Sequence, residues 1–313
     1  MSHRSKTIFS ILVLWVGVST AKEAIPVGDP IALSPPESFF MAPQWSPNGE
    51  QVAAAGPRHA GLYLIEFPTG NFTQLSDAAS VGYGFSWSHD GQKIAARMTT
   101  YENMFKTQML VSFNIIDQSR VTISEPRSRY SGVPQWSSND THIYLSKADK
   151  FESFSLAGDN NNPLSEALIY QKSDHLVRLN TTRSSEQSLF STTDRITSYA
   201  VAPDGQQIAY STSGQNLWVV NSDGSGSRPL GSGIAPSWSP NSEWIVYMLT
   251  EDDGHDMLGS ELYMLHMDHD TPINITQTPD RIEMRPQWSP DGSWIVFDTD
   301  DAGQLFIQQV AWR

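Results

Sequence analysis

The sequence predicts an all-β protein whose strands form a β-propeller, and three observations lead to this fold class. A phrase of the type Trp-Ser-Pro-Asp-Gly recurs through the chain, an apolar strand-like run follows each copy, and helical periodicity is nearly absent. Repeats spaced about 40 to 50 residues apart are typical of propellers and solenoids. The Trp position of the phrase falls at Trp45, Trp87, Trp136, Val201 (in place of Trp), Trp238 and Trp288.

Each repeat predicts four antiparallel strands, with the phrase at the turn between the first two. In that turn Pro presets φ, Asp or Asn bonds its own backbone, and Gly adopts the positive φ that closes the hairpin. The Trp ends the first strand and offers a large rigid surface for packing between sheets. One copy shows the later strands well, with a second strand at 208–210, a third at 217–220 and a short fourth at 228–230. Four such strands make one propeller blade.

The number of blades depends on the 65-residue step from Trp136 to Val201. This step contains either an insertion between about Asp149 and Asp174 or a seventh blade that lacks the phrase. We favour six blades, with seven as the alternative. The last repeat stops after its third strand, 305–311, and 30–34 looks like an unpaired fourth strand. We expect this N-terminal strand to close the ring, which would leave no exposed sheet edge.

Residues 1–21 have the organisation of a secretory signal peptide. Arg4 and Lys6 precede the apolar segment 8–20, which ends with small residues at Ser19 and, just after it, Ala21. The apolar segment is shorter than the roughly 20 residues that a membrane-spanning helix needs. We therefore predict cleavage near Ala21, export to the periplasm with no membrane span remaining, and a single propeller domain over 22–313.

Composition excludes several classes of function. The chain has 313 residues, 20 Lys and Arg against 34 Asp and Glu, a formal net charge of −14 and no cysteine. Disulfides, Cys-ligated metals and thiol catalysis are therefore excluded. A nucleic-acid partner is not expected either, because binding to phosphates requires a basic surface.

The repeats resemble the TolB-like propeller family. The resemblance rests on the Trp-Ser-Pro-Asp-Gly phrase, on the apolar strand after it and on strands such as Leu-Tyr-Met-Leu at 262–265, and it covers about 30–313. It implies the propeller fold but leaves function open, because similar blades occur in tricorn-type proteases, in prolyl-oligopeptidase relatives and in oligogalacturonate lyases. The family's namesake is a periplasmic component of a cell-envelope complex and has an α/β domain before its propeller, which we do not expect here.

The sequence offers no catalytic residues. The nearest match to a serine nucleophile elbow, Gly84 to Ser88, lies inside a repeat, where its serines have strand and turn roles. Acidic loops at 252–256 and 268–270 have the oxygen ligands that calcium prefers. They flank the strand at 261–266, which would place them near opposite ends of it, so we interpret them as solvated turns. We predict no metal ligand and no cofactor, with calcium the one ion left open.

The loops that lead into the Trp strands are the predicted binding surface, at one mouth of a central channel. Arg and Tyr dominate many binding surfaces. The alternative is that the arginines merely pair with the neighbouring Asp194 and Asp280. We predict a non-catalytic protein-binding or scaffold module with a protein partner; the alternatives are a metal-dependent carbohydrate lyase or hydrolase and a sensor of a small peptide or sugar. The candidate binding residues are Tyr83, Arg129, Tyr130, Arg195, Arg281 and Glu283.

Overall fold

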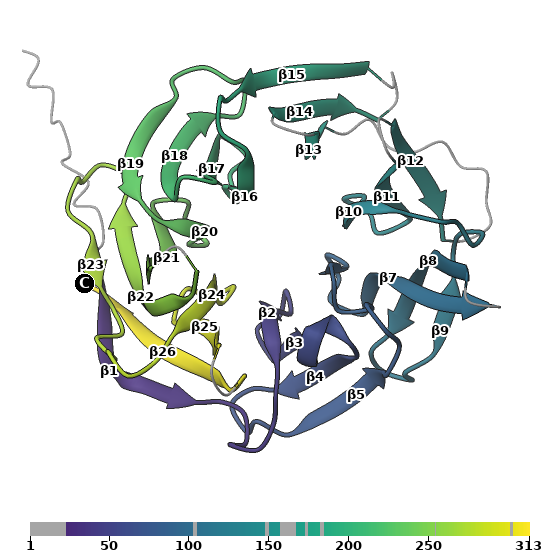
Figure 1. Ribbon diagram of the computed structural model, residues 1–313, viewed down its shortest axis with the longest axis horizontal. Coiled ribbons are helices and arrows are strands. Elements are labelled where there is room, and N and C mark those ends of the chain that lie inside the picture. The colour runs from purple at the N-terminus through teal and green to yellow at the C-terminus, as the bar shows by residue number, and fades with distance from the viewer. Residues whose placement is uncertain are drawn as a thin grey trace, which may run out of the picture.

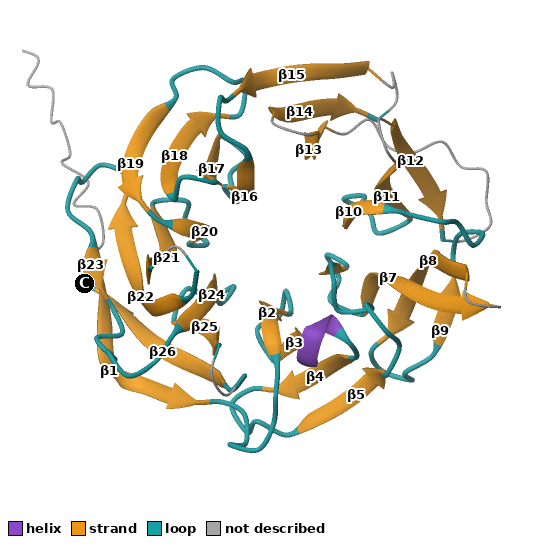
Figure 2. Ribbon diagram, viewed as in Figure 1, coloured by secondary structure: helices purple, strands orange, loops and turns teal. Residues whose placement is uncertain are grey.

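The computed structural model describes most of the chain as a ring of small antiparallel sheets (Figure 1). The described residues are 23–102, 105–147, 150–156, 167–172, 175–181, 185–253, 255–300 and 303–313. Apart from the short 3-10 helix η1 (Pro57–His59), their regular elements are all strands (Figure 2). The predicted all-β propeller is confirmed, whereas the predicted signal peptide, 1–21, lies outside the described residues. In the part of the chain that is described, no helix is long and apolar enough to cross a membrane.

The described strands form seven blades, which follow one another along the chain. Blade 1 contains β2 (Met41–Trp45), β3 (Gln51–Ala55), β4 (Leu62–Glu66) and β5 (Phe72–Ser76). Blade 2 contains β6 (Phe85–Trp87), β7 (Lys93–Glu102), β8 (Phe105–Asn114) and β9 (Arg120–Thr122). Blade 3 contains β10 (Ser131–Trp136), β11 (His142–Lys147) and β12 (Lys150–Ser155). Blade 4 contains β13 (Ala167–Lys172), β14 (His175–Asn180) and β15 (Ser185–Ser191).

The remaining blades complete the ring. Blade 5 contains β16 (Ile196–Val201), β17 (Gln207–Thr212), β18 (Asn216–Asn221) and β19 (Arg228–Ser232). Blade 6 contains β20 (Ile234–Trp238), β21 (Trp244–Asp252), β22 (Met257–His266) and β23 (Ile273–Asn274). Blade 7 contains β24 (Glu283–Trp288), β25 (Trp294–Thr299), β26 (Leu305–Trp312) and β1 (Ala24–Ala32).

The two ends of the described chain meet in blade 7. Strand β1 pairs antiparallel with β26, with Ala24 opposite Trp312 and Ala32 opposite Phe306. The sheet order is therefore β1-β26-β25-β24. The pairing strand begins ahead of the stretch 30–34 that the sequence analysis identified.

The preference for six blades was wrong, because the long step between Trp136 and Val201 contains blade 4. In the other blades the first strand runs from a variable loop toward the Trp phrase. Strand β13 runs the opposite way, since Gln171 near its end donates to the carbonyl of Ile196 (2.8 Å), where β16 begins. Its described strands thus correspond to the second, third and fourth strands of a blade. The phrase that marks the other blades lies between first and second strands, so it could not mark this one.

A buried serine explains why the phrase forms the same turn in five of its six copies. In blade 2, Ser88 Oγ donates to Asp90 Oδ1 (2.6 Å) and accepts from the backbone N–H of Lys93 (2.9 Å). The chain reverses at Gly91, whose φ of 67° favours glycine. The equivalent serines make the same contacts at Ser46, Ser137, Ser239 and Ser289.

Two copies have another residue at the glycine position, and its side chain bonds the turn of the preceding blade. Asp140 in blade 3 keeps a φ of 56°, and its carboxylate accepts from the backbone N–H groups of His89 and Asp90 (both 2.9 Å). Ser242 in blade 6 keeps a φ of 62°, and its Oγ accepts from the N–H of Asp204 (3.1 Å). These hydrogen bonds between blades offset part of the cost of a positive φ.

The tryptophans also join successive blades. Trp238 Nε1 donates to the carbonyl of Ala200 (3.0 Å), the residue before the Val201 marker in blade 5. The same relation to the preceding marker holds for Trp45, Trp87 and Trp136. Trp288 differs, because its buried Nε1 has no hydrogen-bond partner among the described residues. The blades are thus joined by hydrogen bonds between side chains and backbone as well as by packing.

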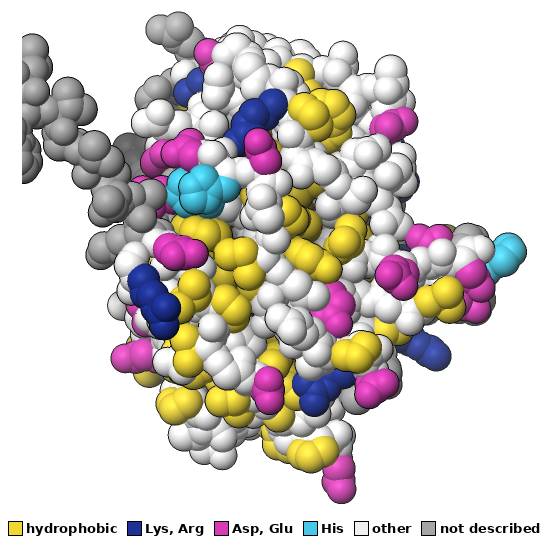
Figure 3. Space-filling view, turned by 90° about the vertical axis from the view of Figure 1, so that its left-hand side faces the viewer, with side chains coloured by type: hydrophobic (Ala, Val, Ile, Leu, Met, Phe, Trp, Pro, Cys, Tyr) yellow, Lys and Arg dark blue, Asp and Glu magenta, His cyan; other side chains and the backbone are white. Residues whose placement is uncertain are grey.

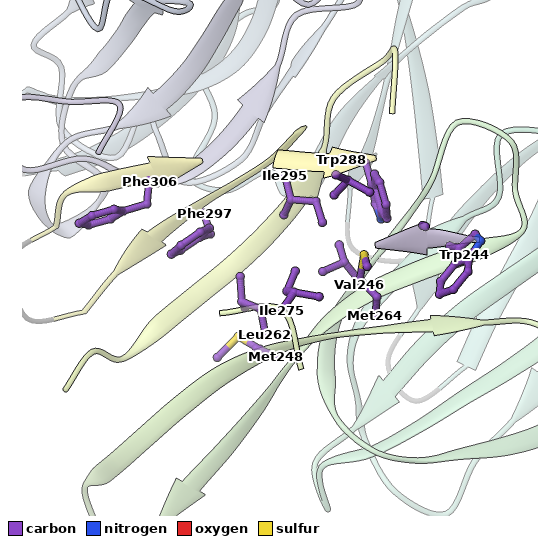
Figure 4. Close-up of a cluster of buried hydrophobic side chains, with 12 residues drawn as sticks. Trp244, Val246, Met248, Leu262, Met264, Ile275, Trp288, Ile295, Phe297 and Phe306 are labelled. Carbon is purple, nitrogen blue, oxygen red and sulfur yellow. The ribbon is translucent and has the colours of Figure 1, made fainter. Parts of the chain in front are cut away.

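Most of the apolar core lies between neighbouring blades. Figure 4 shows the cluster between blades 6 and 7, where Leu262, Met264 and Ile275 lie close to Trp288 and Ile295. These five side chains are almost inaccessible to solvent. Burial of this kind contributes roughly 1.5 to 3 kcal/mol for each large apolar side chain.

Candidate functional site

The two faces of the ring are formed by opposite ends of the inner strands. Loops of variable sequence lead into the inner strands on one side of the ring, which we call the loop face. The inner strands end at the Trp phrases on the opposite side, which we call the Trp/Pro face. Strands of five or six residues, such as β2 and β10, separate the faces by roughly 16 to 20 Å at about 3.3 Å per residue. A site on one face is therefore distinct from a site on the other.

A cavity of about 790 Å³ on the loop face contains four of the six predicted binding residues. We call it the basic pocket, because it contains four cationic side chains and no carboxylate among its lining residues. Its volume falls within the range of ligand sites. Its lining residues are Ser80, Tyr83, Arg97, Lys106, Gln108, Ser128, Arg129, Tyr130, Ser131, Gly132, Val133, Gln171 and Arg195.

Arg97 on β7 holds the loops on two sides of the basic pocket. Its Nη2 donates to the carbonyl of Tyr83 (2.8 Å), and its Nη1 donates to the carbonyl of Tyr130 (3.0 Å). Gly84 lies beside it, and a Cβ there would come within 3.2 Å of Arg97 Nη2. Burial, and then the positive charge of Arg129, lower the pKa of Arg97. Arg97 thus positions both loops.

Tyr83 presents its ring to solvent, as the sequence analysis expected. The ring is 63% exposed and meets the His59 ring edge-on at 4.6 Å between centroids. Burial lowers the pKa of His59. Because the Tyr83 carbonyl is held by Arg97, the exposed ring is attached to a fixed backbone.

Tyr130 has a structural role that sequence reasoning did not foresee. Its side chain is only 1% exposed, and its backbone N–H donates to Gln108 Oε1 (2.9 Å). The Arg127 guanidinium lies 5.6 Å from the Tyr130 ring centroid and pairs with Glu152. This anchored tyrosine fixes the loop that presents the exposed Arg129 beside it.

Arg195 reaches the basic pocket from blade 5. Its backbone carbonyl accepts from the N–H of Ser213 (2.8 Å), while its side chain is exposed. The alternative of an ion pair with Asp194 is not observed in the described part of the chain, and neither Arg129 nor Lys106 forms one there. The charge of these three side chains is therefore not neutralised locally.

Arg281 and Glu283 lie outside the basic pocket, in blade 7. Arg281 covers Phe306, with its guanidinium carbon 4.3 Å from the ring centroid. Glu283 is fully buried, so its side chain cannot contact a partner on the surface. The six predicted residues thus divide into four at the basic pocket and two elsewhere.

The buried Glu283 shares a hydroxyl with a second carboxylate. Thr276 Oγ1 lies 2.7 Å from Glu261 Oε2 and 2.8 Å from Glu283 Oε2, and Thr278 contacts the other Glu283 oxygen. A hydroxyl has one proton to donate, so a proton on Glu283 satisfies the second contact. Burial raises the pKa of Glu283 to about 8, consistent with a protonated side chain at neutral pH.

Sequence reasoning missed the contribution of the β7–β8 hairpin, which supplies Arg97, Lys106 and Gln108. Strands β7 and β8 have ten residues each, against five in β3 and β4. An arginine directly after the apolar run 94–96, in a repeat with unusually long strands, was the available signal.

The basic pocket contrasts with the charge of the whole chain. The formal net charge is −14, and on the side of the ring shown in Figure 3 acidic side chains are more frequent than basic ones. A local cluster of cations on an acidic protein focuses a positive potential where anionic groups can bind.

The acidic loops form turns. Asp253 Oδ1 accepts from the backbone N–H groups of His255 (2.9 Å) and Asp256 (2.8 Å), and these hydrogen bonds lower the pKa of Asp253. Within the described ranges, no three His, Asp or Glu side chains are grouped so that they could hold a metal ion. The arrangement is that of a hairpin tip.

The Trp/Pro face has its own cavity, of about 510 Å³, which we call the Trp/Pro pocket. The phrases of blades 1, 2, 5, 6 and 7 contribute to it, so it repeats the same chemistry from blade to blade. Its lining residues are Gln44, Trp45, Pro47, Trp87, Pro203, Trp238, Pro240, Gln287, Trp288, Ser289 and Pro290.

Comparisons with known proteins support the fold. No family model matches the chain, and no curated protein matches it. Among solved structures, the chain is similar to a TolB-like protein from Agrobacterium tumefaciens, with a TM-score of 0.53, 16% identity and coverage of 88% of this chain and 91% of the other.

Two further structures are similar over nearly their whole length. The β-propeller domain of Cps50 (Swd1) from Myceliophteria thermophila has a TM-score of 0.61 and 11% identity, covering 92% of this chain and 100% of the other. U3-55K has a TM-score of 0.68 and 10% identity, covering 91% of this chain and 99% of the other. At these identities the likeness establishes the propeller fold and nothing more specific.

Proposed function

We propose that this chain is a TolB-like propeller, exported to the periplasm, that binds a protein partner on its loop face without catalysis. The observation that supports this most directly is the basic pocket, where four predicted residues from three separate loops come together. The side chains of that pocket are mostly cationic, aromatic, amide and hydroxyl groups, which suit binding. A nucleophile paired with a general base, which covalent catalysis requires, is not among its lining residues.

Export and the absence of a cofactor are part of this proposal. The pattern of charge and hydrophobicity in residues 1–21 supports secretion. Because the chain has no cysteine, it would fold in an oxidising compartment without forming disulfides. The partner complex should not require a metal ion.

The test is a pull-down from envelope extract with the mature chain, 22–313, in the presence and absence of chelator. We expect one protein partner that chelator does not remove and that is lost when Arg129 and Arg195 are both changed to glutamate. A matched protein with Arg178→Glu, at an exposed position on β14 outside the basic pocket, should retain it. Export is tested by expressing the full chain and sequencing the N-terminus of the periplasmic product.

Two results would overturn the proposal. Capture that the double variant does not affect would place the interaction elsewhere. Metal-dependent depolymerisation of an acidic oligosaccharide by the purified chain would show an enzyme in place of a binding module.

A further inference from the structure

The basic pocket has cations on several independent elements. Lys106 lies on β8, Arg129 on the loop before β10, and Arg195 on the loop before β16, so blades 2, 3 and 5 each contribute one. All three side chains are exposed, and none forms an ion pair in the ranges that the structure describes. Since no carboxylate lines the pocket, these cations are available to pair with an anionic ligand.

The arrangement favours an extended anionic ligand over a compact one. A single phosphate or carboxylate is bound best by donors that converge on one point. Here the cations come from three blades around a cavity of about 790 Å³. Such spacing suits a chain that carries several negative charges along its length.

Apolar surface lies between the cations. The Tyr83 ring is 63% exposed and Val133 is 48% exposed, and both line the basic pocket. Aromatic and apolar surface of this kind binds aliphatic side chains. A ligand that alternates carboxylates with apolar groups therefore fits better than a uniformly charged polymer. The overall charge of −14 also opposes a polyanion such as a nucleic acid.

We propose that the basic pocket binds an acidic peptide segment of a protein partner, an extended stretch in which Asp or Glu residues alternate with apolar ones. This inference rests on the proposed function and names the part of the partner that enters the pocket. Arg129 and Arg195 bind carboxylates, for which the guanidinium fork is suited. Lys106 adds a third charge, and Tyr83 and Val133 contact the apolar side chains. Arg97 positions the two loops.

The test is fluorescence anisotropy with a labelled peptide in which glutamate alternates with leucine and glycine. Arg129→Glu and Arg195→Glu should each weaken binding about tenfold or more. Arg178→Glu, the matched change outside the pocket, should leave binding within about twofold. The same peptide with glutamine in place of glutamate should not bind. Raising the ionic strength from about 0.05 to about 0.5 M should weaken binding of the glutamate peptide, because salt screens exposed charges.

Three results would overturn the inference. The first is equal binding of the glutamine peptide. The second is an unchanged affinity in both pocket variants. The third is preferential binding of inorganic phosphate or of an acidic oligosaccharide, displacing the peptide, which would assign the pocket to another anion.

Failure of the inference can be distinguished from failure of the proposed function. If the pull-down partner is lost in the Arg129→Glu, Arg195→Glu protein but the glutamate peptide does not bind, the chain is a loop-face binding module with another ligand chemistry. If the peptide binds as expected but its addition does not compete with the captured partner, the peptide site stands and the loop-face assignment of that partner fails.

Discussion

The two faces of the ring differ in how their cavities are built. On the Trp/Pro face, five blades contribute copies of the phrase, and most of its serine and tryptophan side chains already form hydrogen bonds within a turn or with the preceding blade. On the loop face, the basic pocket is made by residues that differ from blade to blade, with three exposed cations that form no ion pair in the described structure. The Trp/Pro face thus holds the ring together, whereas the residues of the loop face differ from blade to blade.

This difference teaches where a substitution should affect stability and where it should affect binding. A residue of the repeated phrase participates in packing between blades. Its replacement should therefore lower the stability of the whole ring, because the blades depend on each other. The two arginines of the basic pocket that lie on loops, Arg129 and Arg195, are exposed. Substitutions at the two faces should therefore change different measurable quantities.

The largest expected effect is on the Trp/Pro face. Trp238→Ala should lower the free energy of unfolding by about 3 to 5 kcal/mol, because it removes a side chain that is 6% exposed from between blades 5 and 6. Chemical denaturation measures this loss. A native-like protein with unchanged stability would contradict the packing role.

Trp288 provides a matched comparison. Replacement of either tryptophan by phenylalanine keeps much of the apolar surface, but only Trp238 donates an indole hydrogen bond, to Ala200. Trp238→Phe should therefore cost about 1 kcal/mol more than Trp288→Phe. Equal costs would mean that the hydrogen bond between blades adds no stability.

The second effect concerns the buried serine of the turn. Ser239→Ala should cost about 1 to 3 kcal/mol, since the backbone N–H of Trp244 loses its buried acceptor. Blade 5 has Ala202 at the same position. Ala202→Ser should leave stability unchanged or raise it by up to about 1 kcal/mol. A large loss in Ala202→Ser would show that blade 5 uses a different turn.

The sequence predicted the repeated Trp/Pro face of the fold better than the variable loop face. The repeated phrase predicted the propeller and the inner strand of six blades, because one local pattern of turn residues and Trp recurs with the same physical cause. Blade 4 was only the alternative to an insertion, since its described strands lack the segment in which the marker occurs. Its third strand, His175–Asn180, does resemble Asn216–Asn221 of blade 5, because both have apolar residues at their second, third and fifth positions and end in Asn.

The candidate site was less predictable. Loop position selected Tyr83, Arg129 and Arg195, which line one pocket, but it could not separate them from Arg281, which covers Phe306. Glu283 follows a loop in sequence and yet begins an inner strand, where burial depends on how blades 6 and 7 pack. Contacts between blades are set by the whole ring, so a pattern within one repeat cannot reveal them.

The third prediction uses pH. The folded-state pKa of Glu283, about 8, lies above its ordinary value of 4.5. The folded protein therefore holds a proton that the unfolded chain releases between these two pH values. The stability that this group contributes is fully present below about pH 4.5 and falls as the pH rises toward about 8.

Glu283→Gln should remove that dependence. The melting temperature of the variant, relative to the unchanged protein, should rise as the pH is raised from about 5 to about 8. Glu243→Gln, in an exposed turn of blade 6, is the control and should show no such trend. Parallel curves for the Glu283 variant and the unchanged protein would contradict a protonated, buried carboxyl group.

The smallest effect on stability is expected in the basic pocket, where the effect on binding should be largest. Arg195→Ala should change the free energy of unfolding by no more than about 0.5 kcal/mol, because the side chain is exposed and forms no ion pair with the described residues. Arg281→Ala is a useful contrast, since loss of the contact between Arg281 and Phe306 should lower the free energy of unfolding by about 0.5 to 1 kcal/mol.

Thermal unfolding and peptide anisotropy on the same two proteins separate the two roles. Arg195→Ala should lose peptide binding and keep its melting temperature, whereas Arg281→Ala should keep peptide binding and have a lower melting temperature. If Arg195→Ala instead has a clearly lower melting temperature, the loop face also holds the blades together, and the two faces do not have separate roles in stability and binding.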